Sequence, residues 1–380
     1  MGKSAVIMDI GSKYTKLCIA TKMKGKVKIT TPTYIESPAD NVLRDKGFLQ
    51  RLQLKLSEMK VKGKPLRVVL SRDNINVIVG SDTMQISKGI NEKGVKAGIQ
   101  NKILTGISDK NIVMTDWTIL AQNDDSITYE YAIIKKDTID MLIKIAADNK
   151  LHLESIDVRL SSLVNMYHLM KANNKFNQQE DDDIYCLLYI GTKNYNLVCF
   201  DKDEIIYTKA ESNDLTTLDT DLLMAKEGKA MTTGAGVSLN ADGSFAFGNE
   251  TEESEEQQGY SRKEQLGFRF SEEAVDSYPD YKRRLTQGLI SKVSRQIDKA
   301  TYKGKRVGLK KILLVGSSSK LPHIDEYFKE IFGVDDVEIV DMDELVYYDA
   351  TAHSVANCED MPILTEMYAI SASSLERSKK

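Results

Sequence analysis

The sequence contains little cysteine, histidine, proline or tryptophan, and the first two shortages exclude whole classes of protein. Its 380 residues include 4 cysteines without a CxxC pair, so neither a disulfide scaffold nor a zinc ribbon is expected. The 4 histidines are scattered and form no HExxH pattern, so no metal site is expected. Most of the cysteines lie in apolar runs, as buried thiols do in a reducing compartment, and this predicts a cytoplasmic protein.

Long apolar runs and a strong net charge are missing too. No window approaches the roughly 18–20 apolar residues of a membrane-spanning helix, and Asp9 interrupts the first apolar run, so no secretory leader is expected. The formal net charge of -4 gives no reason to expect nucleic acid or an anionic membrane as a partner. A chain of 380 residues exceeds the usual size of one core, which favours two domains.

What the sequence does contain is one short element written twice. The stretch VIMDIGSKYTKLCIA near the start has a near copy, LLYIGTKNYNLVCF, in the middle of the chain. Aligning Gly11 with Gly191 places Asp9 opposite Tyr189. Each copy has two apolar runs around a glycine turn and a third run after them, which predicts a β-hairpin and a further strand. The period is too long for a solenoid, so the fold is predicted to be a duplication.

Paired glycine turns of this kind suit a phosphate site. If the two turns face each other across a cleft, their backbone N–H groups can hold a polyphosphate, and the Ser or Thr after each glycine adds a hydroxyl donor. An Asp just before the glycine, as Asp9 is, can hold Mg²⁺ through water. A third loop in KKILLVGSSSKLPHIDEYFKEIFG can cover the base; its helix is predicted to turn inward Leu321, Ile324, Phe328 and Ile331.

These three loops carry a resemblance to a known family. MDIGSKYTK, YIGTKN and LVGSSSKLPHIDEYF resemble, in this order, the two phosphate loops and the adenosine loop of the superfamily that joins actin, heat-shock chaperones and sugar kinases. Within it, the chain is most similar to the PilM family of type IV pilus assembly proteins, which is related to FtsA. The middle of the chain supports that choice through the stretch KNIVMTDWTILAQND and, after it, TYEYAIIKKDTIDMLIKIAADNKLHLESIDVRLSSLVNMY.

The resemblance implies a nucleotide site with ATP or ADP and Mg²⁺ as cofactor. The cofactor-binding residues that it implies are Asp9, Gly11, Ser12, Lys13, Tyr14, Lys16, Gly191, Thr192, Lys193, Gly316, Ser317 and Ser318. Two of them have simpler explanations. Asp9 can be a strand-end carboxylate that caps its own turn, and Lys16 can be an ordinary lysine on an exposed strand face. No catalytic residue and no protein metal ligand is expected.

Three departures from the family pattern predict that hydrolysis has been lost. Tyr189 stands where the second hairpin of the family has Asp, and Ser317 stands where the third loop commonly has a second glycine. Lys292 matches a position that is usually acidic and faces the ribose. A group that assists the attack of water typically contributes about 10²–10⁴ in rate, so three coincident losses predict a degenerate ATPase.

The expected fold class is α/β, namely an actin-like, duplicated RNase-H-like fold with an inserted α/β subdomain in the first half. The first actin-like subdomain is expected at residues 1–84 and 150–175, the insert at 85–149 and a linker at 176–183. The second actin-like subdomain is expected at 184–215 and 285–360, a divergent subdomain with a flexible acidic loop at 216–284, and a C-terminal helix and polar tail at 361–380. Within the first half, Asp137 is expected to be the N-cap of a helix over Thr138–Asn149.

The function implied by the resemblance is that of a cytoplasmic scaffold of a type IV pilus, or of a related secretion platform. The ending ISASSLERSKK has no apolar face, so the chain is expected to reach the inner membrane through partners and not by direct insertion. The implied partner is a PilN-like single-span protein, whose N-terminal peptide would bind in a groove, with a pilus ATPase as a further partner. The expected walls of that groove are the strand Leu66–Leu70, the helix Val95–Leu104 and the strand of Trp117, although Trp117 can equally be a packing residue.

Two alternatives remain open from the sequence. The chain can be an active ATPase or small-molecule kinase of the same superfamily, although Tyr189 speaks against an intact second phosphate loop. It can also be a filament-forming or cell-division protein that resembles FtsA, although the amphipathic membrane helix that ends such proteins is not recognisable here.

Overall fold

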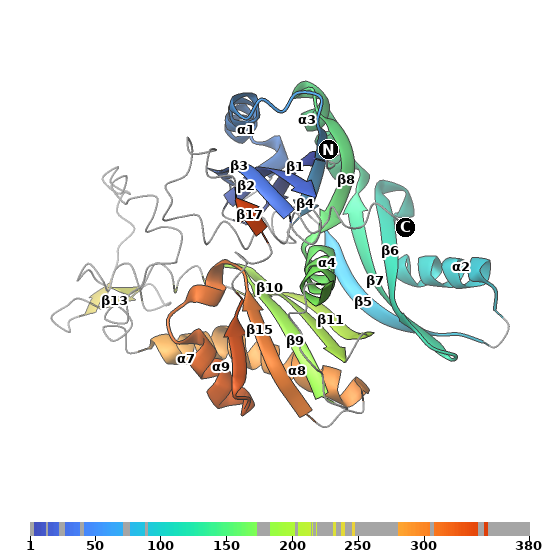
Figure 1. Cartoon of the computed structure of the whole chain (residues 1–380), viewed down its shortest axis with the longest axis vertical. Coiled ribbons are helices and arrows are strands. Elements are labelled where there is room, and N and C mark those ends of the chain that lie inside the picture. Colours follow the sequence, from blue (N-terminus) through green and yellow to red (C-terminus); the bar gives the residue numbers. More distant parts are fainter. Residues whose placement is uncertain are drawn as a thin grey trace.

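Two large β-sheets, two three-stranded sheets and the helices around them make up the described part of the computed structural model (Figure 1). The structure describes residues 4–12, 14–22, 27–38, 42–70, 77–87, 90–172, 183–201, 204–213, 215, 218, 231–232, 237–239, 245–247, 280–304, 308–340 and 346–348.

The first large sheet has the strand order β17-β3-β2-β1-β4-β8. Its strands are β1 (Ser4–Ile10), β2 (Tyr14–Lys22), β3 (Val27–Glu36), β4 (Pro65–Leu70), β8 (His152–Val158) and β17 (Val346–Tyr348). β1, β2 and β3 form an antiparallel meander, whereas β4 and β8 continue the sheet in parallel with β1. β4 is paired on both sides and five of its six residues are buried, so it cannot form the wall of a peptide groove as the sequence suggested.

The second large sheet repeats this arrangement with the order β11-β10-β9-β15-β16. Its strands are β9 (Asp183–Ile190), β10 (Asn194–Asp201), β11 (Glu204–Ser212), β15 (Gly308–Val315) and β16 (Asp336–Ile339). Again a three-stranded antiparallel meander is followed by two parallel strands. The same order and directions in both halves confirm a duplicated RNase-H-like fold.

The helices on the outer faces are amphipathic. In α1 (Lys46–Glu58), Phe48, Leu52 and Leu56 recur at helical spacing and pack on the first sheet. α3 (Lys136–Asp148) packs on the same core. Asp137 is not its N-cap: the cap is Lys135, and Asp137 lies in the first turn, where its carboxylate pairs with Arg44.

The second sheet is covered on its outer face by a helix in three parts and by one short helix. The first consists of α7 (Tyr281–Leu285), a π-helical turn at Thr286–Ile290 and α8 (Ser291–Gly304). The second is α9 (Ile324–Phe332), in which Ile324 and Phe328 are buried as predicted. Ile331 is not buried, because its side chain is 38% exposed at the end of the helix.

One helix lies between the two halves. α4 (Arg159–Ala172) packs against strands of both large sheets, and almost all its described side chains are buried (Figure 1). Its apolar residues share one core with strands β1 and β2 on one side and β9, β10 and β15 on the other. A helix that packs on two sheets needs apolar residues on more than one face, and α4 has them. The two halves are therefore joined by a continuous hydrophobic core.

The inserted subdomain is a small sheet with the order β5-β7-β6, formed by β5 (Ile78–Gln85), β6 (Val113–Gln122) and β7 (Ser126–Lys135). α2 (Glu92–Ile103) covers one face through Val95, Ile99 and Ile103, and Trp117 packs against this core. The small sheet begins before the expected residue 85, and α3 belongs to the core of the first half. The contacts of Trp117 with the core under α2 support a packing role for this side chain.

The remaining expectations meet the structure only in part. β17 pairs with β3, so residues 346–348 lie in the first sheet and not in the second half, where the sequence placed them. Three short strands, β12 (Met231–Thr232), β13 (Val237–Leu239) and β14 (Phe245–Phe247), form a separate sheet within the divergent region. The tail at 361–380, nearly all of the linker and most of the acidic loop lie outside the described residues.

Two features of composition can be followed in the structure. Cys18, Cys186 and Cys199 are buried free thiols, as the sequence suggested, and Cys358 lies outside the described residues. In the part of the chain that the structure describes, no helix is both long and apolar enough to cross a membrane.

Candidate functional site

The two glycine hairpins have the same local geometry. The backbone N–H of Gly11 donates to the carbonyl of Tyr14 at 3.1 Å, and that of Gly191 donates to the carbonyl of Asn194 at 2.8 Å. A Cβ at Gly11 would lie 2.8 Å from the Tyr14 carbonyl oxygen, which real Cβ atoms do not approach so closely. The tight turn therefore requires glycine in the first copy, and the repeat in the sequence is a repeat in structure.

The third loop contacts the second hairpin. Gly316 has a φ of 97°, in the left-handed region that favours glycine. A Cβ there would lie 2.6 Å from the carbonyl oxygen of Ile190 and 2.8 Å from the ring of Tyr189. The ring of Tyr189 also lies against Gly191, where an added Cβ would be 3.1 Å from it. The aromatic ring thus fills the space where the second and third loops meet.

Asp9, at the end of β1, is completely buried and makes two ion pairs. The guanidinium of Arg159, the first residue of α4, donates to its Oδ1. The ammonium of Lys16, on β2, lies 3.6 Å from its Oδ2. Lys16 is 5% exposed and Arg159 3%, so neither cation is a surface side chain. The sequence-based alternatives, a turn-capping Asp9 and an exposed Lys16, are both wrong.

Burial and charge oppose each other in this cluster. Burial raises the pKa of Asp9, but the charges of Arg159 and then Lys16 outweigh it and hold the pKa below its usual value of 3.8. Burial lowers the pKa of Lys16 to about 8, with Asp9 opposing the change and Arg159 reinforcing it. The pKa of Arg159 is raised, since Asp9 outweighs the effect of burial. The carboxylate and guanidinium are therefore both charged at neutral pH.

Tyr189 closes the cluster from the second half. Its ring is 3% exposed, and the guanidinium carbon of Arg159 lies 4.9 Å from the ring centroid. This is within the distance for a cation–π contact. Arg159 therefore joins a carboxylate of the first hairpin to an aromatic ring of the second. We call Asp9, Lys16, Arg159 and Tyr189 the Arg159 cluster.

Two features of the described residues oppose the binding of a Mg²⁺–nucleotide complex between these loops. Asp9, the expected metal partner, faces two internal cations, and the ring of Tyr189 fills the junction of the second and third loops. A cavity beside Arg159, also lined by Leu160 and Asn194, has a volume of only about 10 Å³. That is room for one water molecule. Among the described residues, no cluster of three His, Cys, Asp or Glu side chains is arranged to hold a metal.

The structure brings part of the expected site together. Asp9, Lys16, Gly191 and Gly316 meet around Arg159 and Tyr189. At the tip of the second hairpin the carbonyls of Thr192 and Lys193 accept backbone N–H groups from Leu215 and Asn213, which tie the segment after β11 to that hairpin.

The other expected residues contribute less to this site. Ser12 and Tyr14 are half-buried and Ser318 is buried, while Lys13 and the side chain of Ser317 lie outside what the structure describes. Lys292 lines a different cavity, between α8 and β11.

Arg159 is the residue that sequence reasoning missed. The signal was a single arginine in the apolar helical stretch VRLSSLVNMYHLM, where a charged residue needs a buried partner. Its partner lies 150 residues away in the sequence, so the pair could not be recognised locally.

Comparison with known proteins agrees with this topology. No protein-family model and no curated protein sequence matches the chain. A chain of the solved PilM–PilN type IV pilus biogenesis complex superimposes with a TM-score of 0.64 at 13% identity, over 100% of this chain and 99% of that one. The chain has this actin-like fold.

More distant solved structures include the ethanolamine utilization protein EutJ from Carboxydothermus hydrogenoformans, with a TM-score of 0.45 and 10% identity over 98% of this chain and 91% of that one. MreB5 of Spiroplasma citri bound to ADP has a TM-score of 0.41 and 9% identity, over 99% of this chain and 96% of that one. The resemblance drawn from the three loops is confirmed at the level of the fold by the match to the chain of the PilM–PilN complex.

Proposed function

We propose that this protein is a non-catalytic, actin-like scaffold of a type IV pilus or related secretion platform, held at the inner face of the cell membrane by a membrane protein that it binds. The observation that carries the proposal is the match in fold to the PilM–PilN complex over the full length of both chains. A shared fold does not by itself fix function, so the site and the surface must be consistent with it.

The Arg159 cluster supports the absence of catalysis. An active site of this superfamily would use the carboxylates at the two hairpins to hold Mg²⁺ and orient water. Here one of those positions is Tyr189, and Asp9 is already neutralised by two internal cations. Mg²⁺ would have to displace a buried guanidinium before it could bind. We therefore propose that the cluster takes the structural place of the Mg²⁺–nucleotide and that the protein hydrolyses no ATP.

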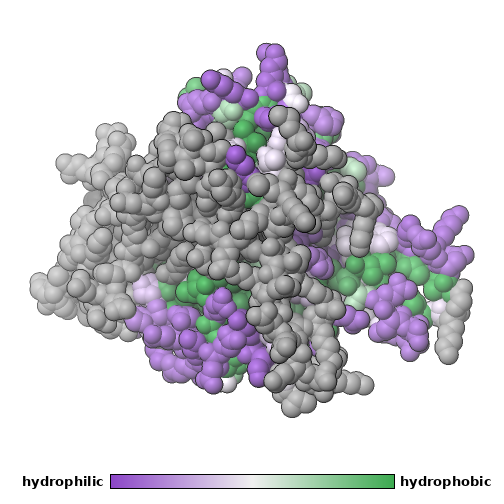
Figure 2. All heavy atoms as spheres, in the orientation of Figure 1, coloured by the Kyte–Doolittle hydropathy of each residue, from purple (hydrophilic) through white to green (hydrophobic). Residues whose placement is uncertain are grey.

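The surface for a partner lies, in this proposal, at the boundary between the small sheet and the first half. Ile112 and Met114, just before and within β6, are 53% and 50% exposed, and Ile119 of the same strand is 38% exposed. Met114 is paired opposite Ile134, which packs on the core of the first half. A band of hydrophobic side chains is visible over the region of the small sheet in Figure 2.

Strand β6 is the edge of the small sheet, and β8 is the edge of the first large sheet among the described strands. An extended peptide can add to such an edge by backbone pairing and place alternate apolar side chains against it. The N-terminal peptide of a PilN-like single-span protein is the partner we propose. Because ordering a flexible peptide costs roughly 2–5 kcal/mol of the contact energy, the affinity should be modest.

The test is a calorimetric titration of the purified full chain with the N-terminal peptide of the PilN-like protein from the same organism. Met114→Glu should abolish measurable binding, because it places a charge in the apolar contact. Leu54→Glu on α1 is the matched control, since Leu54 is 60% exposed and lies outside the proposed surface. No binding up to millimolar peptide by a folded protein, or equal loss in both variants, would contradict the proposal.

A further inference from the structure

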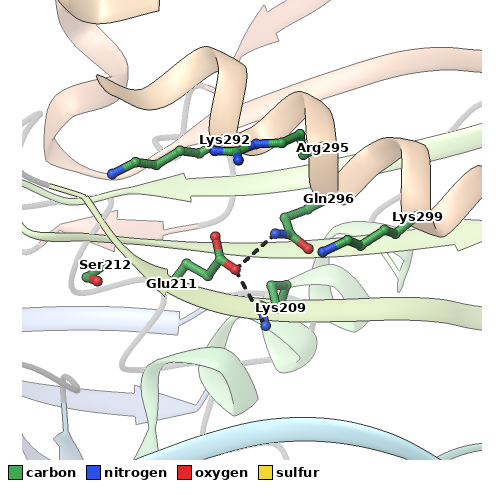
Figure 3. A pocket seen from close by; sticks show the side chains of 7 residues that line it. All are labelled: Lys209, Glu211, Ser212, Lys292, Arg295, Gln296 and Lys299. Atoms are coloured by element: carbon green, nitrogen blue, oxygen red, sulfur yellow. Dashed lines mark hydrogen bonds and ion pairs between the residues drawn. The ribbon is translucent and has the colours of Figure 1, made fainter. Parts of the chain in front are cut away.

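A second concave surface lies between α8 and β11, and it shares only Glu211 with the small cavity beside Arg159. It encloses about 530 Å³ and is lined by Lys209, Glu211, Ser212, Lys292, Arg295, Gln296 and Lys299. In Figure 3 the strand side chains and the helix side chains face each other across this space. We call it the α8–β11 groove. Its lining contains four cations, one carboxylate and no apolar residue.

The floor of the groove is a fixed network of polar groups. Glu211 accepts a hydrogen bond from the hydroxyl of Tyr195 at 2.6 Å and another from Nε2 of Gln296 at 2.9 Å. Gln296 is itself 5% exposed and accepts from the hydroxyl of Tyr207 at 2.7 Å. Burial raises the pKa of Glu211, but the bond from Tyr195 and the charge of Lys209 outweigh it and hold the pKa below its usual value. Glu211, the one carboxylate in the described lining of the groove, is thus ionised and already hydrogen-bonded to Tyr195 and Gln296.

The cations of the groove outnumber their partners. Lys209 is the one within ion-pair distance of Glu211, at 3.5 Å. Among the described residues, Lys292, Arg295 and Lys299 form no ion pair with a carboxylate; Arg295 donates only to the backbone carbonyl of Ser291. Within the lining that the structure describes, four cations thus face one carboxylate, and positive charge is in excess. A solvated helix face needs no such cavity beside it, and this distinguishes the groove from an ordinary basic surface.

The spacing of the three cations selects the kind of anion. Residues three and four apart on a helix lie about 5–6 Å from each other, so the three side chains form a row along α8. Alternate side chains of an extended peptide repeat at about 6.6 Å, which matches this row. A nucleotide base or a lipid chain would need apolar or aromatic lining, which the groove lacks.

We propose that the α8–β11 groove binds an acidic peptide segment of a partner protein, extended, with carboxylates at alternate positions. The three helix cations pair with successive carboxylates, while the fixed Glu211 repels any acidic residue out of register. This surface and the one proposed for the PilN-like peptide lie on different elements, so the chain would hold two partner segments at once. Recognition of this kind depends on charge and should weaken with salt.

The experiment measures binding of a fluorescent, capped peptide of alternating glutamate and serine to the full chain by anisotropy at low salt. The test variant is Lys292→Gln/Arg295→Gln/Lys299→Gln. The control, Lys46→Gln/Arg51→Gln/Lys62→Gln, removes the same charges from exposed positions in the first half. Because exposed ion pairs contribute little singly, we expect the test variant to weaken binding about 10-fold and the control to change it less than 2-fold.

Two further probes separate the proposal from its rivals. The glutamine analogue of the peptide should not bind, and binding of the glutamate peptide should fall steeply as salt is raised. The proposal is overturned if the control variant loses as much affinity as the test variant, which would indicate only net charge. It is also overturned if inorganic triphosphate binds more tightly than the peptide, or if the peptide binds only after deletion of the chain's own acidic run at residues 250–256.

Discussion

Replacement of Arg159 by methionine tests the central feature of the site. Methionine keeps an unbranched side chain of similar length but removes the guanidinium that pairs with Asp9 and lies over Tyr189. Asp9 would then remain completely buried with Lys16 as its only cation, 3.6 Å away. Breaking a buried ion pair by removing one partner typically costs about 3–5 kcal/mol. Against a typical free energy of unfolding of about 5–15 kcal/mol, this is a large loss.

The loss should depend on pH in a definite direction. In the wild-type protein the folded pKa of Asp9 is below 3.8, so its contribution is complete above that value and is lost as pH falls through the folded pKa. In Arg159→Met the strongest cause that lowers the pKa is gone, so we expect burial to outweigh Lys16 and to raise the folded pKa of Asp9 above 3.8. The variant is then penalised at neutral pH, and the penalty is relieved as Asp9 becomes protonated on acidification. The difference between the two proteins should therefore narrow from neutral pH down to about pH 4.

Urea unfolding followed by circular dichroism, at neutral pH and again just above pH 4, provides the measurement. Arg44→Met is the matched control, because Arg44 pairs with Asp137 where both side chains are mostly exposed, and an exposed pair contributes at most about 1 kcal/mol. Asp9→Asn/Arg159→Met should recover part of the loss, since it removes the unpaired charge. A deficit in Arg159→Met that is the same at both pH values, or a double variant less stable than either single one, would refute the reasoning.

Three further predictions concern neighbouring residues. Burial lowers the pKa of Lys16 to about 8, against 10.5 for the free side chain. The free energy of unfolding of the wild-type protein should therefore rise between these two pH values, and that of Lys16→Met should lack this rise. The same alkaline pH profile in both proteins would contradict the prediction. Gly316→Ala should destabilise by about 1–3 kcal/mol in thermal unfolding, and clearly more than Gly63→Ala, where φ is also positive but nothing lies within 4 Å. Tyr189→Asp alone should not create Mg²⁺-dependent ATP binding in calorimetry, because Arg159 would pair with the new carboxylate; the double variant with Arg159→Ala should bind, and binding by the single variant would disprove the proposed block.

Much of the fold could be predicted because its signals are local. The glycine turns at Gly11 and Gly191 lie between continuous apolar runs, and those runs are the buried central strands of the two sheets. In the helix α1, the spacing of Phe48, Leu52 and Leu56 is sufficient to predict the buried face. Such patterns depend on neighbours in the sequence, which is why the duplication could be recognised from two short stretches.

The features that were missed depend on contacts between distant segments. Nothing near Val346–Tyr348 indicates that this strand pairs with β3 of the first half. Asp137 is a residue type that favours the N-cap position, but the helix starts two residues earlier than predicted, and the carboxylate of Asp137 pairs with Arg44 instead. The charge of Arg159 was visible, whereas its partner Asp9 was identified only as a metal-binding candidate. The sequence thus predicted the glycine turns of the candidate site but not the ion pairs of Asp9 with Arg159 and Lys16.

Tyr189 and Arg159 support each other in the structure. Without Arg159, Asp9 would be a buried carboxylate with only Lys16 as a charged partner, which would lower the free energy of unfolding. Arg159 supplies a second positive charge, and the ring of Tyr189 in turn covers the guanidinium. The two halves of the chain thus meet through a continuous core and an internal ion pair. We infer that these contacts hold the two halves together without a bound ligand, as the proposed scaffold role requires.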